Sequence, residues 1–133
     1  MPYTLIDHTA DMGIRVSAPS LEGLFEEAAY ALADIMGARC GEGLQGVVVE
    51  SQGIDRVDLL VRWLQEILYL IEVKGFRLRA VTIQRLTETL AIGVMQGAYT
   101  ADPLTTEIKA VTYHNLDITS IDNVFMATII LDR

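Results

Sequence analysis

The segment from Arg56 to Lys74 constrains the fold more than any other part of the chain. Residues at the spacing of one helical face form an apolar stripe along it: Val57, Leu60, Val61, Leu64, Leu68 and Ile71. Other residues widen this stripe until most of the helix surface is apolar: Leu59, Trp63, Ile67 and Leu70. Such a helix needs other elements covering it on two sides. Asp55 is the expected cap of this helix, and Gly75 is its expected stop.

A second helix is predicted from Leu21 to Met36, and its boundaries are well signalled. The Ser20 hydroxyl is suited to accept a free N–H of the first turn, where Glu22 also complements the helix dipole. Gly37 suits the left-handed backbone conformation that ends many helices.

The remaining segments favour strands, which we place at 3–6, 14–18, 45–52, 76–86, 89–99, 111–120 and 124–131. A loop is expected at 7–13 and hairpin turns at 87–88 and 121–123. A change in the alternation of apolar residues predicts a bulge near Ala80. The chain is therefore expected to form one α+β domain over 1–133, with two helices packed on a mostly antiparallel β-sheet.

Composition narrows the class of protein. Apolar residues make up 51% of the chain, which excludes a disordered protein. The net charge of −8 argues against a broad basic face for nucleic acid. The longest apolar run, 125–131, is too short to cross a membrane, and the first residues do not form a secretory signal. With Cys40 as the single cysteine, we expect a reduced, soluble, cytoplasmic protein.

Catalytic motifs are not found in the sequence. The glycine-rich stretch 37–46 does not contain the Gly-Lys-Ser/Thr of a phosphate-binding loop and is expected to be a connector. Cys40 has no signalled base partner, and no Gly-x-Ser-x-Gly elbow occurs. His8 and His114 are expected to be hydrogen-bonded structural residues rather than metal ligands.

Three polar residues at predicted strand ends are the candidates for function. Asp11 is either a turn residue or an oxygen ligand of a hard cation. A cation needs a second carboxylate, and Asp132 is the candidate, although it could simply solvate the end of its strand. Lys109 is one of two lysines beside eight arginines, and apolar residues flank it. Two interpretations are open for Lys109. Its ammonium contacts a phosphate or an acidic partner, or it is simply a solvated lysine on an edge strand.

Several stretches of the chain together resemble the archease family. They read Asp-His-Thr-Ala-Asp-Met-Gly-Ile at 7–14, Ser-Leu-Glu-Gly-Leu-Phe-Glu-Glu-Ala-Ala at 20–29 and Glu-Ile-Lys-Ala-Val-Thr-Tyr-His at 107–114. The apolar strand that closes on Leu131-Asp132 also fits. The similarity extends in order over essentially the whole chain.

This resemblance implies a non-catalytic protein cofactor rather than an enzyme. Its expected partner is the tRNA-splicing RNA ligase, and tRNA would be reached only indirectly through that ligase. The cofactor would promote guanylylation and multiple turnover of the ligase in tRNA splicing and RNA repair, and broaden its use of nucleotide triphosphates. An alternative is a chaperone or modulator of another RNA-processing enzyme, such as a tRNA methyltransferase; a small metal-dependent hydrolase is a third option.

The resemblance also implies residue roles. The divalent-cation site of the family falls on Asp11 and Asp132, with a backbone oxygen of Arg133 as a further ligand. The lysine that the family requires for function falls on Lys109, and Asp11 and Asp132 share in activating the partner. Because oxygen atoms alone would bind the cation, Ca²⁺ is expected, with Mg²⁺ or Mn²⁺ as alternatives.

Overall fold

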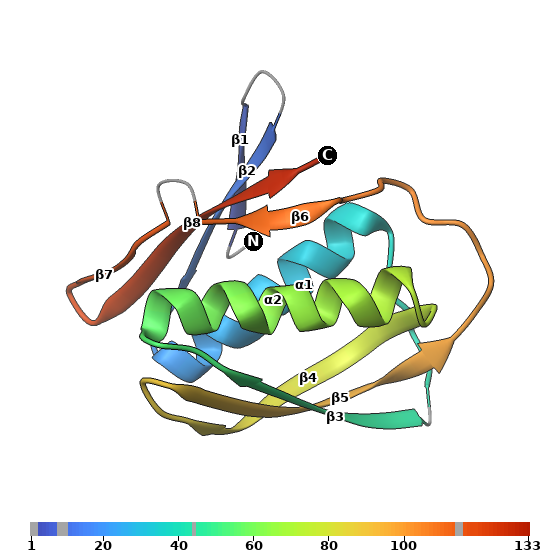
Figure 1. Cartoon of the computed structure of the whole chain (residues 1–133), viewed down its shortest axis with the longest axis horizontal. Coiled ribbons are helices and arrows are strands. Elements are labelled where there is room, and N and C mark those ends of the chain that lie inside the picture. The colour runs from blue at the N-terminus through green and yellow to red at the C-terminus, as the bar shows by residue number, and fades with distance from the viewer. Residues whose placement is uncertain (1–2, 8–10, 44, 114–115) are drawn as a thin grey trace.

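Two helices lie between two antiparallel sheets in the computed structural model, which describes residues 3–7, 11–43, 45–113 and 116–133 (Figure 1). The helices are α1 (Leu21–Met36) and α2 (Arg56–Glu72). The strands are β1 (Tyr3–Asp7), β2 (Asp11–Ala18), β3 (Gln45–Gln52), β4 (Phe76–Leu86), β5 (Leu90–Tyr99), β6 (Ala110–Thr112), β7 (Ile118–Ile121) and β8 (Val124–Asp132). The predicted α+β class is confirmed, but the sequence did not indicate that the strands divide between two sheets.

The larger sheet has β8 at its centre. Along one edge β8 pairs with the full length of β2, and β2 pairs in turn with β1. The other edge of β8 is shared, because β6 pairs with its last residues and β7 with its first. The tight turn between β7 and β8 contains Asp122 and Asn123, which both have positive φ, as this kind of hairpin turn requires.

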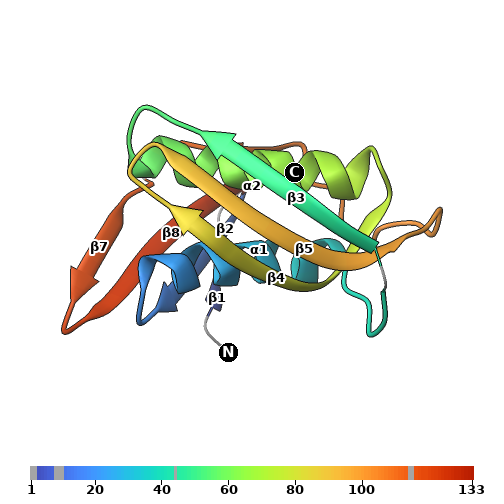
Figure 2. The same cartoon turned by 90° about the horizontal axis from the view of Figure 1, so that it is seen from below.

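The smaller sheet has the order β3-β5-β4 and lies across the other side of the helices (Figure 2). The bulge predicted near Ala80 is present as a register shift between Leu78 and Ala80, and a second shift separates Ile83 from Arg85. Helix α1 covers the free edge of β4: the Val81 N–H donates to the Tyr30 hydroxyl at 2.9 Å and the Ile83 N–H to the Glu26 carboxylate at 2.8 Å. These side chains take hydrogen bonds that another strand would otherwise take.

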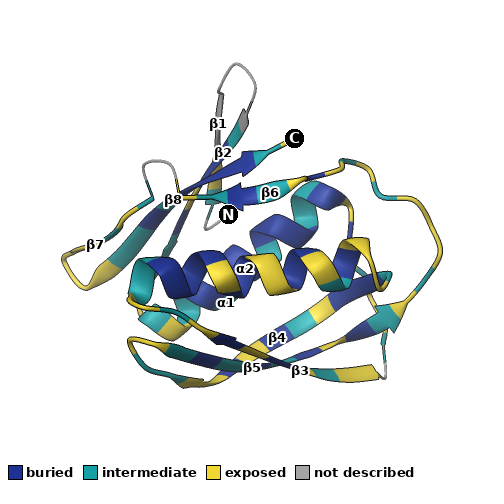
Figure 3. Cartoon of the chain, in the orientation of Figure 1, coloured by how far each residue is buried: buried dark blue, intermediate teal, exposed yellow. Residues whose placement is uncertain are grey.

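Helix α2 contacts β3 of the smaller sheet and β6 of the larger sheet, so the predicted cover on two sides is confirmed (Figure 3). Its buried apolar residues are Leu59, Leu60, Val61, Trp63, Leu64, Ile67, Leu68 and Ile71. The Trp63 indole N–H donates to the Phe25 carbonyl at 3.0 Å, which joins the two helices inside the core. Neither helix of the described chain is long and apolar enough to cross a membrane.

The helix boundaries follow the predicted caps. The Ser20 hydroxyl accepts the Gly23 N–H at 3.0 Å, and Gly37 ends α1 with a φ of 71°. The Asp55 carboxylate accepts the Asp58 N–H at 2.8 Å. Helix α2 ends at Glu72, two residues before the predicted end.

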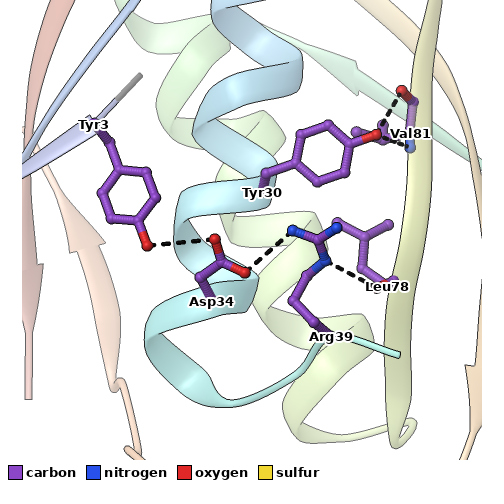
Figure 4. A network of polar contacts seen from close by, with 6 residues as sticks. All are labelled: Tyr3, Tyr30, Asp34, Arg39, Leu78 and Val81. Carbon is purple, nitrogen blue, oxygen red and sulfur yellow. Dashed lines mark hydrogen bonds and ion pairs between the residues drawn. The ribbon is translucent and has the colours of Figure 1, made fainter. Parts of the chain in front are cut away.

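A polar network joins α1 to both sheets (Figure 4). The Tyr3 hydroxyl of β1 donates to the Asp34 carboxylate at 3.3 Å, and Arg39 donates to the same carboxylate at 3.1 Å. Arg39 also donates through Nε to the Leu78 carbonyl of β4 at 3.2 Å and lies over the Tyr30 ring. The network therefore connects the first strand of one sheet to an edge strand of the other through a single helix.

Two predicted boundaries near the candidate residues are wrong. The expected loop at 7–13 is shorter, because Asp7 ends β1 and Asp11 already begins β2. The expected strand at 111–120 is divided into β6 and β7. In both cases the pairing partner decides the length, since β2 pairs with β8 as far as Asp132 and the two shorter strands share the other edge of β8.

Candidate functional site

The three candidate residues come together at one end of the larger sheet. In the register of the antiparallel ladder, Asp11 of β2 lies directly opposite Asp132 of β8. On the other side of β8, Asp132 lies opposite Ala110, the first residue of β6. The N–H of the preceding residue, Lys109, donates to the Asp132 carbonyl at 2.7 Å. Residues from three separate parts of the sequence therefore meet around the end of β8.

The segment before β6 fixes the direction of Lys109. Ile108 is fully buried in the core, whereas Lys109 is exposed. An extended chain turns successive side chains to opposite sides, so burying Ile108 directs the next side chain outward. Upstream, the Thr105 N–H donates to the Met36 carbonyl at the end of α1, at 2.9 Å. The backbone is thus held both before Lys109, by the bond from Thr105 to α1, and after it, by the pairing of β6 with β8.

Helix α2 holds the other end of this segment. The Tyr113 hydroxyl donates to Oδ1 of Asp58 at 2.5 Å, and the Gln65 side-chain amide donates to the Val111 carbonyl at 3.4 Å. The second oxygen of Asp58, Oδ2, accepts the Ile54 N–H and the Arg62 Nε–H, each at 2.9 Å. Although Asp58 is only 7% exposed, both of its carboxylate oxygens have partners.

These contacts shift the pKa values of the groups involved. The hydrogen bond from the Tyr113 hydroxyl, followed by the bond from the Ile54 N–H and the pairing with Arg62, lowers the pKa of Asp58. The same bond to the Asp58 carboxylate, together with burial, raises the pKa of Tyr113. Both shifts favour an ionised Asp58 that accepts a hydrogen bond from a neutral, protonated Tyr113.

No direct signal in the sequence indicates the Asp58–Tyr113 contact. Tyr113 belongs to the stretch at 107–114 that carries the family resemblance, but the sequence suggested no partner for it. Asp58 sits three residues after the cap Asp55, where an acidic residue is already expected at a helix start. The two residues are 55 positions apart, so only the tertiary fold brings them into contact.

Oxygen atoms are the donors that the end of β8 offers to a cation. Asp132 is half-buried at the last position of β8, and Arg133 is exposed directly after it. The structure describes the backbone of Asp11, whereas His8 and His114 lie outside the described residues. Among the side chains that are described, no three His, Cys, Asp or Glu residues gather into a metal-binding cluster.

Comparison with known proteins extends the similarity over the whole chain. Residues 3–132 match the model of the Archease protein family (MTH1598/TM1083). Protein archease of Methanopyrus kandleri is 37% identical, over 99% of each chain. The solution structure of protein 1598 from Methanobacterium thermoautotrophicum superposes with a TM-score of 0.79 at 30% identity, covering 99% of each chain.

A crystal structure from Thermotoga maritima, described as an archease and possible chaperone, superposes with a TM-score of 0.68 at 25% identity. It covers 96% of this chain, and this chain covers 94% of it. The fold is thus that of a small α+β protein with two helices between antiparallel sheets. The chain belongs to the archease family.

Proposed function

We propose that this protein is a non-catalytic cofactor of the tRNA-splicing RNA ligase. It promotes guanylylation of the ligase, supports multiple turnover in tRNA splicing and RNA repair, and broadens the nucleotide triphosphates that the ligase accepts. The observation that carries this proposal is the meeting of Lys109, Asp132 and Asp11 around the end of β8. The family resemblance implies that the residues at these three positions act on the ligase.

The charge distribution suits contact with a protein that itself holds nucleotide and RNA. With a net charge of −8, this chain is repelled by a phosphate backbone at long range. The exposed ammonium of Lys109 instead offers one local contact to an acidic or phosphate group in a partner's pocket. RNA therefore reaches this protein only through the ligase.

The proposed mechanism is a shift between states of the ligase. Binding of the end of β8 near the nucleotide pocket stabilises the ligase conformation that accepts the guanylyl group. The size of the stimulation is then set by how much better this protein binds that conformation than the other. No covalent step takes place on this chain.

A divalent cation belongs to this proposal. Directly opposed positions of an antiparallel ladder lie on the same face of the sheet, with Cβ atoms about 4.5–5.5 Å apart. Asp11 and Asp132 occupy such positions, so two carboxylates and a backbone oxygen of Arg133 are suited to bind a hard cation. We assign the cation as Ca²⁺, with Mg²⁺ and Mn²⁺ as alternatives. When bound, it would fix the acidic end of β8 in one geometry.

A guanylylation assay of the cognate ligase, with and without this protein, tests the proposal. We expect faster transfer of the guanylyl group to the ligase and more than one turnover per ligase molecule. An unstimulated ligase would contradict the proposal. The assay is repeated with the other nucleotide triphosphates to test the broader nucleotide use.

The alternative is a chaperone or modulator of another RNA-processing enzyme, as the description of the Thermotoga maritima protein suggests. It would act through exposed apolar side chains such as Ile54 and Ile121, which are 83% and 66% exposed. The variant Asp11→Ala separates the two functions. It should remove ligase stimulation if the end of β8 acts on the ligase, and should leave a chaperone activity unchanged.

A further inference from the structure

Strand β6 is too short to fix the position of Lys109 by strand pairing alone. It has three residues and pairs only with the last residues of β8 among the described strands. Edge strands of this length separate readily from a sheet, since few backbone hydrogen bonds hold them. Contacts outside the sheet are therefore needed to keep β6 in register.

Those contacts come from α2. Gln65 bonds the Val111 carbonyl in the middle of β6, and Asp58 bonds the Tyr113 hydroxyl directly after it. The Tyr113 side chain is 50% exposed, so its hydroxyl reaches a buried carboxylate from the surface of the molecule. Strand β6 is consequently held at both ends. The Lys109 N–H bonds to β8 just before it, and the Tyr113 hydroxyl bonds to α2 just after it.

Asp58 is itself held rigidly. Its Oδ2 accepts bonds from the Ile54 N–H and from Arg62 one helical turn later. Gly53 packs so closely here that a Cβ on it would lie 2.7 Å from the Leu59 N and 3.0 Å from Oδ2 of Asp58. The Tyr113 hydroxyl therefore binds to an acceptor whose orientation other contacts already determine.

We propose that Asp58 and Tyr113 form a latch that holds β6 on α2 and so positions Lys109 beside Asp132. This inference rests on the proposed function for its biological meaning, but the latch itself is a property of this chain alone. Asp58 and Tyr113 are positioning residues: they act on the partner only through the placement of Lys109. Opening the latch releases β6 while leaving the pairing of β2 with β8 in place.

The first experiment measures backbone amide exchange by NMR in the full chain, without any ligase. Tyr113→Phe removes only the hydroxyl. Tyr30→Phe is the matched control, because it also removes a hydrogen-bonded hydroxyl, the one that accepts the Val81 N–H of the smaller sheet. We expect exchange at Lys109 and along β6 to be roughly tenfold faster in Tyr113→Phe, with β2 unchanged. Tyr30→Phe should leave β6 unchanged.

The second experiment measures ligase stimulation as a function of the concentration of this protein. If the latch sets the fraction of molecules with Lys109 in place, Tyr113→Phe raises the half-maximal concentration in inverse proportion to that fraction and leaves the plateau unchanged. Asp58→Asn, which keeps the shape of the side chain, should change both readouts in the same direction. It also provides a second test if one variant folds poorly.

Two results would overturn the latch: unchanged exchange at Lys109 in Tyr113→Phe, or equal acceleration at Lys109 in Tyr30→Phe. Failure of the proposed function would look different. In that case the ligase would not respond even to the wild-type protein, while Tyr113→Phe would still accelerate exchange along β6.

Discussion

The backbone N–H of Lys109 donates to the backbone carbonyl of Asp132 over 2.7 Å. This bond joins the segment before β6 to the last residue of β8, and it involves neither side chain. The charged groups of both residues therefore remain available for other contacts, while their Cα atoms keep a fixed separation. A partner that reads both charges meets them at a spacing set by the backbone.

Replacing Lys109 with alanine should remove function without removing stability. The side chain is exposed, so Lys109→Ala should change the free energy of unfolding by no more than about 0.5 kcal/mol. Stimulation of ligase guanylylation should be lost or sharply reduced. Lys109→Arg should rescue poorly, because a planar guanidinium does not replace a compact ammonium.

The control for this variant is Lys74→Ala, which removes the other exposed lysine, just beyond the end of α2. It should stimulate the ligase as well as the wild-type protein does. If Lys109→Ala also stimulates normally, the residue is only a solvated edge-strand lysine. If that variant unfolds, its role is structural.

The double variant Asp11→Ala, Asp132→Ala should lose calcium binding. Two carboxylates supply the negative charge of the proposed site, and neutral oxygen atoms alone bind a hard cation weakly. Titration calorimetry with Ca²⁺ measures the difference, and Asp122→Ala, in the turn between β7 and β8, is a control that removes one exposed acid elsewhere. Equal heats from the wild type and the double variant would refute the cation site.

Gly93→Ala should destabilise the protein by about 1–3 kcal/mol, the usual cost of overpacking a core. A Cβ at this position would lie 2.5 Å from Cη2 of the buried Trp63. Gly46→Ala, on β3 of the same sheet, is the control because its added Cβ would meet nothing within 4 Å. Urea unfolding compares the two variants, and equal midpoints would contradict the packing argument.

Stability should depend on pH through Asp58. Because the bonds from Tyr113, Ile54 and Arg62 lower its folded pKa, Asp58 contributes stability above its unfolded pKa of about 3.9. That contribution is lost as the pH falls through the lower, folded pKa. Asp58→Asn should therefore show a shallower loss of stability below about pH 4 in thermal melts. Parallel curves for the two proteins would contradict this assignment.

Local signals predicted the helices and most strands well. Residues close together in the sequence determine where the helices begin and end: Ser20 and Gly37 for α1, and Asp55 with the apolar run after it for α2. The alternation that indicates the bulge near Ala80 is local in the same way. Such features depend on the intrinsic geometry of helices and strands, which sequence spacing records directly. The same signals contain no information about which sheet a strand joins.

The candidate site was predicted only in part, because its residues meet through tertiary pairing. The family resemblance selected Asp11, Asp132 and Lys109, and the register of β2, β8 and β6 brings these positions together. Tyr113 and Asp58 were not selected, since a helix-start acid and a strand-end tyrosine each have an ordinary local explanation. Their contact depends on how α2 crosses the larger sheet.

The pairing of β2 with β8 has a consequence for biosynthesis. Asp11 and Asp132 are among the first and last residues of the described chain to pair, and β8 is also the strand on which β6 depends. During synthesis, Asp11 and Lys109 emerge from the ribosome before β8 exists, so neither has its final neighbours. A nascent or truncated chain that ends before β8 contains both residues but lacks the assembled end of β8 on which the proposed function depends.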